Sequence, residues 1–431
     1  MICSNLGTNG LGHLTFAGFD TAELAKKYKT PLYLMDEQRI RENCRTYVRT
    51  LESCFGGKAL VLFAGKAAAF KEMYRIAESE GMGVDVVSPG EIYTAYKAGF
   101  PMERAFFHGN NKSDEDIAFA MDCGVGYFVA DGADELEAVN RIALERGITQ
   151  KLLLRLTPGI DPHTYAAVNT GMVDSKFGAA IETGQAQELF LRAADMKGIS
   201  LEGFHCHVGS QVFGEDVFQR ASLIMLRFFA RLKAEYGYET KIFDLGGGYG
   251  VRYTDSDPQI DLPKRIAEVA EYIKSAAAEL GLEVPMILME PGRSIVADGG
   301  MTLYTVGAVK CIPGYKNYVS VDGGMTDNPR YALYQSRYTV YLANRMNDSG
   351  DFPCDLVGRC CESGDVIQPR LRLPRPVRGD IVAVCTTGAY NYSMASNYNR
   401  VCRPPVVMLS GGRGRVAVER ESLEDITRND V

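Results

Sequence analysis

A lysine that closely follows a short apolar segment is the residue in this sequence with the clearest chemical potential. Residues 59–64 are all apolar and predict a buried strand, and Lys66 lies two positions beyond it. A lysine ammonium is almost never fully buried without a partner. One interpretation is a strand-end side chain that reaches solvent. The other is a desolvated lysine, whose neutral amine is nucleophilic and can form a Schiff base with a carbonyl.

Histidine and glutamate side chains offer further chemistry. His205 and His207 flank Cys206, and residues two apart in a strand share a face. A zinc site is one interpretation, but no further cluster of ligand residues lies nearby in the sequence, so we expect no metal. Glu290 ends another apolar segment, where it could cap a helix or pair with Arg293. Alternatively, its carboxylate could keep a pyridine nitrogen protonated, as pyridoxal 5′-phosphate (PLP) chemistry requires.

These residues need a framework, and the sequence predicts one from repeating strands and helices. Eight short apolar or β-rich segments alternate with helical patterns, which predicts parallel β/α units. The predicted strands are Ala59–Ala64, Gly83–Val87, Ala105–His108, Tyr127–Ala130, Lys151–Leu156, Leu201–Cys206, Lys241–Leu245 and Met286–Met289. The predicted helices include Glu37 to about Leu51, Pro89–Ala98, Ser113–Cys123, Ala133–Arg146, Gly184–Ala194, Val217–Tyr236 and Leu262–Leu280. Eight units favour a closed (β/α)₈ barrel of the TIM type over a doubly wound open sheet.

Polar and glycine-rich residues follow the ends of these predicted strands. Lys66 follows the first strand, His207 the sixth and Glu290 the eighth. In such barrels the active site lies at the carboxyl ends of the strands, and the loops after strands seven and eight commonly bind phosphate. Here those loops contain Gly246–Gly250 and Gly292 with Arg293. A plain turn is the alternative for the glycines, but their position favours a phosphate site.

The pattern changes after about Val296, where strand-like segments dominate. They are Thr302–Val309, Tyr318–Val321, Tyr338–Leu342, Asp380–Thr386, Pro405–Leu409 and Gly414–Glu419, followed by one short helical segment near Ser422. We therefore expect residues 37–295 to form the barrel. Residues 1–36 and 296–431 are expected to form a second, β-sandwich or barrel-like domain.

Composition limits the possible partners and compartments. The 431 residues carry a net charge of −7 without a dense basic run, which argues against nucleic-acid or anionic-membrane partners. No apolar segment is long enough to span a bilayer, and the first residues do not resemble a secretory signal. The 11 cysteines show no paired metal-type spacing. We expect a reduced, cytoplasmic protein.

The chain resembles the fold-type III PLP-dependent amino-acid decarboxylases from about residue 31 to residue 399. The segment at 63–67 is similar to the family's cofactor-lysine segment, and the segment at 205–211 is similar to its HxHxGSQ motif. The resemblance implies an alanine racemase/ornithine decarboxylase-like fold, with Lys66 holding PLP, His207 stacked on its ring and Glu290 at its nitrogen. The cofactor-binding residues that it implies are Lys66, Asp85, His207, Ser210, Gly247, Gly248, Glu290, Gly292, Arg293 and Tyr390.

Motifs in the second domain are similar to those of the diaminopimelate branch of this family. They are the CESGD segment at 361–365 and the GAY segment at 388–390. The substrate-binding residues implied are Arg293, Arg330, Tyr334, Glu362 and Tyr390. Cys361 is implied to be catalytic and to face the cofactor of an opposing subunit, so a homodimer with shared active sites is expected.

The implied reaction is decarboxylation of meso-2,6-diaminopimelate to L-lysine and CO₂, with either Cys361 or Lys66 as the proton donor. Four residues depart from the family pattern, namely Phe63, Ala68, Pro89 and Arg359. The alternatives are a decarboxylase of carboxynorspermidine, ornithine or arginine, a PLP-dependent racemase, a non-catalytic binding protein, and a sugar-phosphate barrel enzyme. The last would explain the glycine loop but not Lys66, His207 and Glu290 together.

Overall fold

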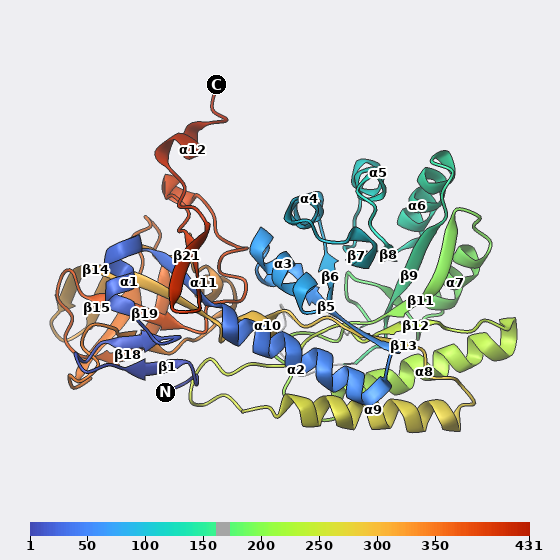
Figure 1. The fold of residues 1–431 in the computed structure, drawn as a ribbon, viewed down its shortest axis with the longest axis horizontal. Coiled ribbons are helices and arrows are strands. Elements are labelled where there is room, and N and C mark those ends of the chain that lie inside the picture. The colour runs from blue at the N-terminus through green and yellow to red at the C-terminus, as the bar shows by residue number, and fades with distance from the viewer. Residues whose placement is uncertain (161–172) are drawn as a thin grey trace. The chain divides into compact units, whose positions relative to one another are not determined.

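The protein, seen here as a computed structural model, is described over residues 1–160 and 173–431 (Figure 1). The chain divides into two compact units. The barrel unit comprises Asn43–Gly250 and Ile260–Gly292. The β unit comprises Met1–Glu42, Val251–Gln259 and Arg293–Val431.

The barrel unit contains a closed ring of parallel strands, as predicted. In ring order these are β5 (Ala59–Ala64), β6 (Gly83–Val86), β7 (Ala105–Phe107), β8 (Tyr127–Ala130), β9 (Gln150–Thr157), β11 (Ile199–His205), β12 (Ile242–Asp244) and β13 (Met286–Met289). Pairing of β8 with β9 and of β13 with β5 completes the ring, which excludes the doubly wound alternative. A short strand, β10 (Ala179–Ala180), adds to β9.

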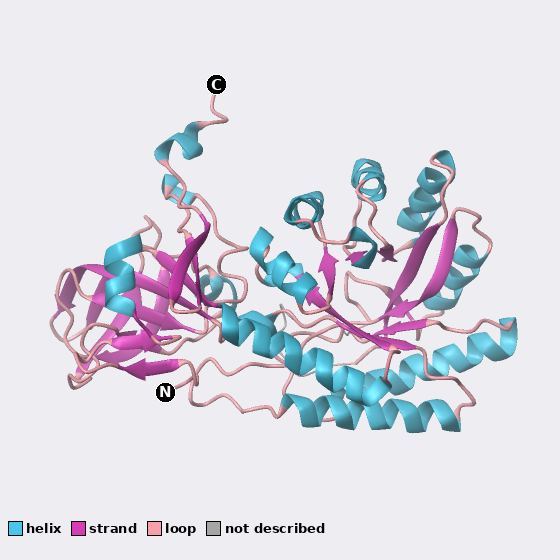
Figure 2. Ribbon diagram, viewed as in Figure 1, coloured by secondary structure: helices cyan, strands magenta, loops and turns pink. Residues whose placement is uncertain are grey.

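Helices lie outside the ring of strands (Figure 2). They are α3 (Lys71–Ser79), α4 (Pro89–Ala98), α5 (Asp114–Asp122), α6 (Ala133–Glu145), α7 (Gln185–Ala194), α8 (Val217–Tyr236) and α9 (Leu262–Glu279), with most of α2 (Glu37–Phe55) and the 3₁₀ turns η1 (Gly65–Ala67) and η2 (Met102–Arg104). Local signals set their ends. Ser113 and Asp116 form a capping box at α5, Ser88 caps α4, and the left-handed Gly99 ends α4.

The interior of the barrel holds one apolar layer and one polar layer. Six strands contribute the apolar layer, which consists of Leu62, Phe106, Val129, Leu153, Ile242 and Leu288. Side chains two apart in a strand share a face, so the residue two positions later on each strand also points inward. Those residues are Ala64, His108, Asp131, Arg155, Asp244 and Glu290. The strict alternation of the strands therefore places a set of charged groups directly above an apolar core layer.

The β unit is built around a long strand that belongs to two ladders. β14 (Gly300–Ile312) pairs through its first half with β4 (Leu32–Asp36) and β19 (Ile381–Cys385), and through its second half with β15 (Lys316–Val321). The remaining strands are β1 (Leu6–Thr8), β2 (Leu14–Phe16), β3 (Phe19–Asp20), β16 (Val340–Leu342), β17 (Phe352–Val357), β18 (Val366–Leu373), β20 (Val406–Ser410) and β21 (Arg413–Val418). The short helices are α1 (Thr21–Tyr28), α10 (Arg293–Val296), α11 (Arg330–Tyr334), η4 (Tyr398–Arg400) and α12 (Leu423–Thr427).

Several elements of the structure were not predicted. β17 and β18 each contain a proline, and register shifts interrupt their pairing, so neither shows an alternating pattern. Pro369 and the left-handed Arg370 mark the irregular part of β18. α3 and α11 are short helices that were also missed. In the described part of the chain, no helix combines the length and the apolar character needed to cross a bilayer.

Candidate active site

Lys66 lies at the carboxyl end of β5, in the turn η1, as predicted. Its Nζ is 3.8 Å from Oδ2 of Asp85, the side chain of the lysine is 45% exposed, and that of the aspartate is 2% exposed. A Cβ on Gly65 would lie 2.8 Å from the Tyr74 hydroxyl and 2.9 Å from the Asp85 carbonyl oxygen, so only glycine fits before the lysine. The lysine is therefore neither buried alone nor fully solvated, because it borders a buried acid.

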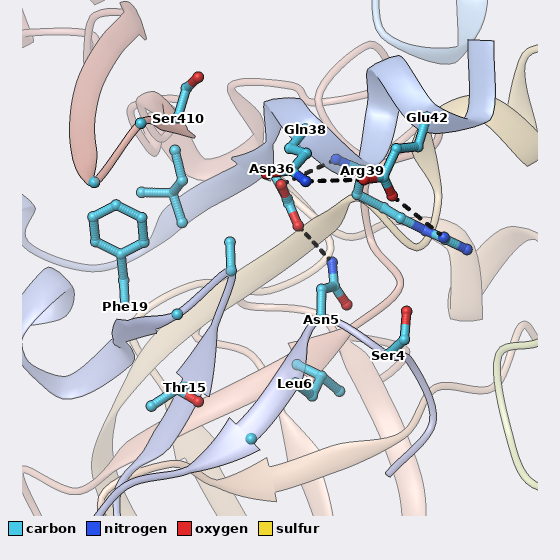
Figure 3. A pocket seen from close by; sticks show the side chains of 16 residues that line it. Ser4, Asn5, Leu6, Thr15, Phe19, Asp36, Gln38, Arg39, Glu42 and Ser410 are labelled. Carbon is cyan, nitrogen blue, oxygen red and sulfur yellow. Dashed lines mark hydrogen bonds and ion pairs between the residues drawn. The ribbon is translucent and has the colours of Figure 1, made fainter. Parts of the chain in front are cut away.

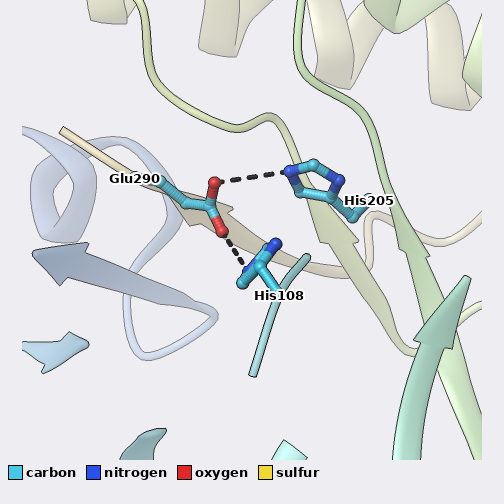
Figure 4. A group of neighbouring side chains, drawn as sticks. All are labelled: His108, His205 and Glu290. Carbon is cyan, nitrogen blue, oxygen red and sulfur yellow. Dashed lines mark ion pairs between the residues drawn. The ribbon is translucent and has the colours of Figure 1, made fainter. Parts of the chain in front are cut away.

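Glu290 lies inside the ring of strands and contacts two histidines (Figure 4). Its Oε1 is 2.7 Å from Nε2 of His108, and its Oε2 is 3.3 Å from Nε2 of His205. His205, which we considered with His207 as a zinc pair, instead joins His108 and Glu290.

Three buried carboxyl groups lie at this end of the barrel, and their pKa values move in opposite directions. Burial raises the pKa of Asp85, and it raises that of Asp244 well above the usual range. Burial acts on Glu290 in the same sense, but His108 and His205 outweigh it and hold the pKa of Glu290 well below its usual range. The surroundings therefore favour the ionised form of Glu290 and the protonated form of Asp244. Divergent pKa values of this kind are typical of acid–base sites.

His207 contacts the glycine loop rather than His205. The Gly247 N–H lies 3.3 Å from Nδ1 of His207 and donates to it, so this nitrogen is an acceptor. Burial, together with the nearby positive charge of Lys66, holds the pKa of His207 well below its usual range. The ring is therefore uncharged at neutral pH, and the site can present a flat, neutral imidazole beside the lysine.

The glycine loop packs against its neighbours with almost no space for side chains. A Cβ on Gly247 would lie 2.1 Å from the Glu290 carbonyl oxygen, and one on Gly248 would lie 2.3 Å from the Gly209 carbonyl oxygen. The Val212 N–H donates to the Gly248 carbonyl at 2.9 Å. This bond ties the segment that contains Ser210 to the glycine loop. The predicted phosphate-binding segments thus lie side by side.

The predicted substrate residues of the β unit form a second cluster. The guanidinium groups of Arg293 and Arg330 lie 4.8 Å and 5.1 Å from the ring centroid of Tyr390. Arg293 donates from Nη1 to the Tyr253 hydroxyl at 2.7 Å, and Arg330 donates from Nε to the Tyr338 hydroxyl at 2.9 Å. The ring of Tyr334 also lies near Arg330, with its centroid 5.5 Å away. Two buried arginines are therefore held in one aromatic frame.

Cys361 and Glu362 lie on an exposed turn of the β unit. Asp365 anchors this turn, because its carboxylate accepts the N–H groups of Cys360 at 2.8 Å and Met325 at 2.6 Å. Asp365 is buried, whereas Cys361 and Glu362 are exposed. In this motif the buried Asp365 therefore stabilises the turn, while the side chains of Cys361 and Glu362 are accessible to solvent.

Three of the four residues that depart from the expected family pattern have structural explanations. Phe63 and Ala68 are completely buried on either side of Lys66, where they fill apolar space. Pro89 is the first residue of α4, a position that suits proline. Nothing in the structure explains Arg359.

Sequence reasoning missed His108, His205, Asp244, Tyr253 and Tyr338 as site residues. A signal for two of them was present, because His108 and Asp244, like the predicted Glu290, each follow an inward-facing apolar residue by two positions. Tyr253 and Tyr338 carry no such signal, since they meet Arg293 and Arg330 only after the chain folds. A cavity of about 510 Å³ in the β unit, next to Asn5, Asp36 and Arg39, contains none of the predicted residues (Figure 3).

The residues of the barrel mouth fit a phosphorylated pyridine cofactor. They offer an amine beside a buried acid, an ionised carboxylate, a neutral imidazole and a tight glycine loop. In addition, both ring nitrogens of His205, Nε2 of His108 and Oε1 of Glu290 are buried without a hydrogen-bond partner among the described residues. The fold and the site therefore define the class of the protein as a (β/α)₈-barrel enzyme suited to a pyridine cofactor.

Comparison with known proteins identifies the family. Residues 37–297 match the model of the pyridoxal-binding domain of pyridoxal-dependent decarboxylases. The chain is 43% identical to a diaminopimelate decarboxylase of Bacillus subtilis over 98% of this chain and 96% of the relative, and 41% identical to one of Staphylococcus aureus over 98% and 99%. A crystal structure of diaminopimelate decarboxylase from M. jannaschii in complex with L-lysine superposes with a TM-score of 0.90, at 32% identity, over 99% of this chain and 98% of that one. The chain belongs to the pyridoxal-dependent decarboxylases, and PLP is its cofactor.

Proposed function

We propose that the protein decarboxylates meso-2,6-diaminopimelate at one end and releases L-lysine and CO₂. The observation that carries this proposal is the burial of the charged Arg330 side chain, since this residue is only 5% exposed. Among the residues that the structure describes, no carboxylate forms an ion pair with it. A buried charge without a counter-charge is strongly unfavourable, so an anionic group of the ligand is the natural partner.

The requirement for an anion separates the candidate substrates. Diaminopimelate carries a second carboxylate, whereas ornithine and arginine carry a cation at the same end. Arg293 and Arg330 both contact Tyr390, so the aromatic frame holds two guanidinium groups together. Paired guanidinium groups suit a carboxylate, because each offers two parallel N–H donors, and they repel a cationic side chain.

The cofactor is expected to bind through the residues that gather at the barrel mouth. Lys66 would hold it, His207 would lie on the ring, and Glu290 would face the ring nitrogen. Ser210, Gly247, Gly248 and Gly292 would contact the phosphate, with Asp85 beside the lysine amine. Arg293 and Tyr390 of the β unit are further cofactor-binding candidates implied by the family resemblance. When bound, PLP supplies an electron-accepting ring that takes up the electron pair left behind by departing CO₂.

Side chains of the protein are expected to hold the proton at the ring nitrogen and to supply the proton that the product needs. The ionised Glu290 can accept a hydrogen bond from a protonated ring nitrogen, whereas burial raises the pKa of Asp244 well above its usual range and makes it the weaker candidate for that carboxylate. After the C–C bond breaks and CO₂ leaves, the α-carbon must receive one proton. Cys361 and Lys66 are the two candidate donors. The exposed position of Cys361 on its turn supports donation into the site of another subunit.

The same exposed turn supports a homodimer with shared active sites. Cys361 and Glu362 are presented outward, while Asp365 holds the turn from below. All the cysteines of the sequence carry free thiols, including several exposed or half-buried ones. Free thiols of this kind support a reducing, cytoplasmic compartment.

A decarboxylation assay tests the substrate. The purified protein is supplied with PLP and then with meso-diaminopimelate, its L,L isomer, ornithine, arginine and lysine, and released CO₂ is measured. We expect release from the meso compound alone. Release from ornithine or arginine, with none from meso-diaminopimelate, would overturn the proposal.

An Arg330→Gln variant sharpens this test. It should bind meso-diaminopimelate at least about 10-fold more weakly, because hydrogen bonds to a charged group contribute about 1.5–3 kcal/mol. Arg359→Gln is the matched control, since it makes the same substitution at an exposed arginine of the β unit. Its affinity should match that of the unmodified protein.

A further inference from the structure

The carboxylate of Glu290 meets one imidazole at each oxygen. His108 lies 2.7 Å from Oε1 and His205 lies 3.3 Å from Oε2, both through Nε2 (Figure 4). The two imidazole rings meet edge to face, with 4.9 Å between centroids and an interplanar angle of 76°. The side chains of all three residues are at most 5% exposed. This arrangement is a closed clamp on the acid.

The backbone fixes both arms of this clamp. The N–H of His108 donates to the Val86 carbonyl at 2.8 Å, which continues the pairing of β7 with β6. The loop that follows is held by Lys112, whose buried ammonium donates to the Gly109 carbonyl at 2.8 Å and the Val129 carbonyl at 2.9 Å. His205 ends β11 and pairs in register with neighbours on both sides. Strand pairing therefore fixes the backbone from which each imidazole extends toward the carboxylate.

The distance between His108 and Glu290 argues against a shared metal ion. His108, His205 and Glu290 are suitable ligand types, and their ligand atoms lie within 4.8 Å of one another. Ligand atoms around a tetrahedral zinc would lie roughly 3.3 Å apart, given bonds of about 2.0 Å. The 2.7 Å between Nε2 of His108 and Oε1 of Glu290 is shorter and lies within the range of a direct ion pair. The cluster is therefore better described as an acid in direct contact with two imidazoles.

We propose that His108 and His205 are positioning residues, which together fix the plane of the Glu290 carboxyl group and keep it ionised inside the barrel. The expected effect on catalysis rests on the proposed function, in which Glu290 faces the ring nitrogen of the cofactor. The positioning of the Glu290 carboxyl group rests only on the contacts described above.

The other groups around Glu290 are consistent with this role. Asp85 on β6 and Asp244 on β12 are acids that would repel a second negative charge, and burial keeps their pKa values raised. Arg155 on β9 attracts negative charge but lies beside Asp131, with 3.8 Å between Nε and Oδ1. Burial lowers the pKa of His205 to about 3, so its ring is uncharged at neutral pH. Removal of the imidazole donors would leave Glu290 with burial and two neighbouring acids, and all of these raise its pKa.

Nuclear magnetic resonance of the cofactor-free protein tests the clamp directly. Glutamate labelled with ¹³C at the carboxyl carbon reports the ionisation of Glu290, and a Glu290→Gln sample assigns its signal. In the unmodified protein Glu290 should remain ionised down to the lowest pH at which the protein stays folded. In His108→Leu and His205→Leu it should become protonated at a higher pH. Unchanged titration in both leucine variants would overturn the proposal.

Conservative variants separate positioning from mere packing. His108→Gln and His205→Gln keep an N–H near the position of Nε2, so they should restore the low pKa of Glu290 that the leucine variants lose. His13→Leu is the matched control, because His13 also pairs with a carboxylate, Asp20, at 2.9 Å but lies in the β unit. It should leave the Glu290 signal unchanged. If glutamine fails to restore the signal while the fold is intact, the hydrogen-bond role is wrong.

Cofactor affinity provides the second measurement. Loss of one donor to a charged group should raise the dissociation constant of PLP about 10- to 100-fold in the leucine variants. The ring nitrogen of ¹⁵N-labelled PLP should also lose its protonated chemical shift. Neither measurement uses an amino-acid substrate, so an error in the substrate proposal leaves both unaffected. A dissociation constant within about 3-fold of the original in both leucine variants would contradict the inference.

Discussion

Arg330 donates a hydrogen bond from Nε to the hydroxyl of Tyr338 at 2.9 Å. Arg293 repeats the arrangement with Tyr253, and the two tyrosine rings meet edge to face with 5.5 Å between centroids. The tyrosines therefore fix the separation of the two guanidinium groups before any ligand arrives. Preorganisation of this kind lowers the entropy that ligand binding must overcome.

Removal of the Tyr338 hydroxyl should weaken substrate binding more than it slows catalysis. In Tyr338→Phe the aromatic packing remains, but Arg330 loses a fixed acceptor and gains rotational freedom. We expect KM to rise about 5- to 10-fold with kcat changed less than about 2-fold, since a single hydrogen bond contributes about 1–1.5 kcal/mol. Steady-state kinetics measure both. Tyr28→Phe, which removes a hydroxyl bonded to the Gly414 carbonyl, should leave KM unchanged; an equal effect in both variants would contradict the prediction.

Lys66→Ala should abolish covalent attachment of the cofactor. The variant should lose the long-wavelength absorbance of bound PLP and at least about 1,000-fold in activity, as expected when a residue central to the chemistry is removed. Absorbance and CO₂ release are measured on the same sample. Lys71→Ala is the control, because Lys71 is exposed at the start of α3. Retention of the absorbance band in Lys66→Ala would remove Lys66 from its proposed role.

The buried ion pair of Lys112 and Glu135 should be costly to break from one side. Nζ of Lys112 lies 2.6 Å from Oε1 of Glu135, and their side chains are 1% and 7% exposed. Lys112→Met leaves a buried carboxylate without its partner and should lower the free energy of unfolding by about 3–5 kcal/mol. Urea denaturation measures it. The double variant with Glu135→Gln should recover part of the loss, and Arg141→Ala, which breaks an exposed pair, should cause no measurable change.

Asp327 should make the protein less stable as the pH rises from about 4 to 7. Burial raises the pKa of Asp327 to about 7, although the hydroxyl of Tyr304 donates to it and opposes the rise. In the unfolded chain its pKa is near 4, so between these values the folded state binds more protons than the unfolded state. Stability from this group is therefore lost as pH rises through the window, by about 2–4 kcal/mol. Asp327→Asn should remove this slope from urea denaturation measured across the range, and an unchanged slope would contradict it.

Gly247→Ala should damage the site through the backbone. The added Cβ would lie 2.1 Å from the Glu290 carbonyl oxygen, so the loop or the end of β13 must shift. We expect a loss of about 1–3 kcal/mol in the free energy of unfolding and at least about 10-fold weaker PLP binding. Gly57→Ala is the control, because no atom lies within 4 Å of its added Cβ. Equal behaviour of the two variants would show that the close contact is not important.

The sequence was sufficient to predict the barrel because its signals are local and repeated. Each of the eight predicted strands is present with nearly the predicted bounds, and α4 and α8 match theirs. Alternation, capping residues and glycines determine these elements without reference to distant parts of the chain. The strands β17 and β18 were not predicted because Pro353 and Pro369 interrupt their alternating pattern. Pairing with neighbouring strands, rather than a local signal, stabilises them.

The candidate site was predictable where a side chain follows directly from its strand. Lys66 and Glu290 each lie at a strand end, and the structure places both there. Their partners were not predictable in the same way. The contact of Glu290 with His108 joins residues 182 positions apart, which periodicity along the chain does not encode. Tyr253 was missed for the same reason, since it reaches Arg293 across 40 positions.

The alternation of inward and outward side chains along the barrel strands links the packing of the core to the position of the site residues. Leu288 belongs to the apolar layer and Glu290 to the polar layer, and both point inward on β13. A slip of one residue in β13 would turn both outward and bring Met289 to the interior in their place. Core packing and the acid would therefore be lost together. The register that packs the barrel core is therefore also the register that builds the candidate site.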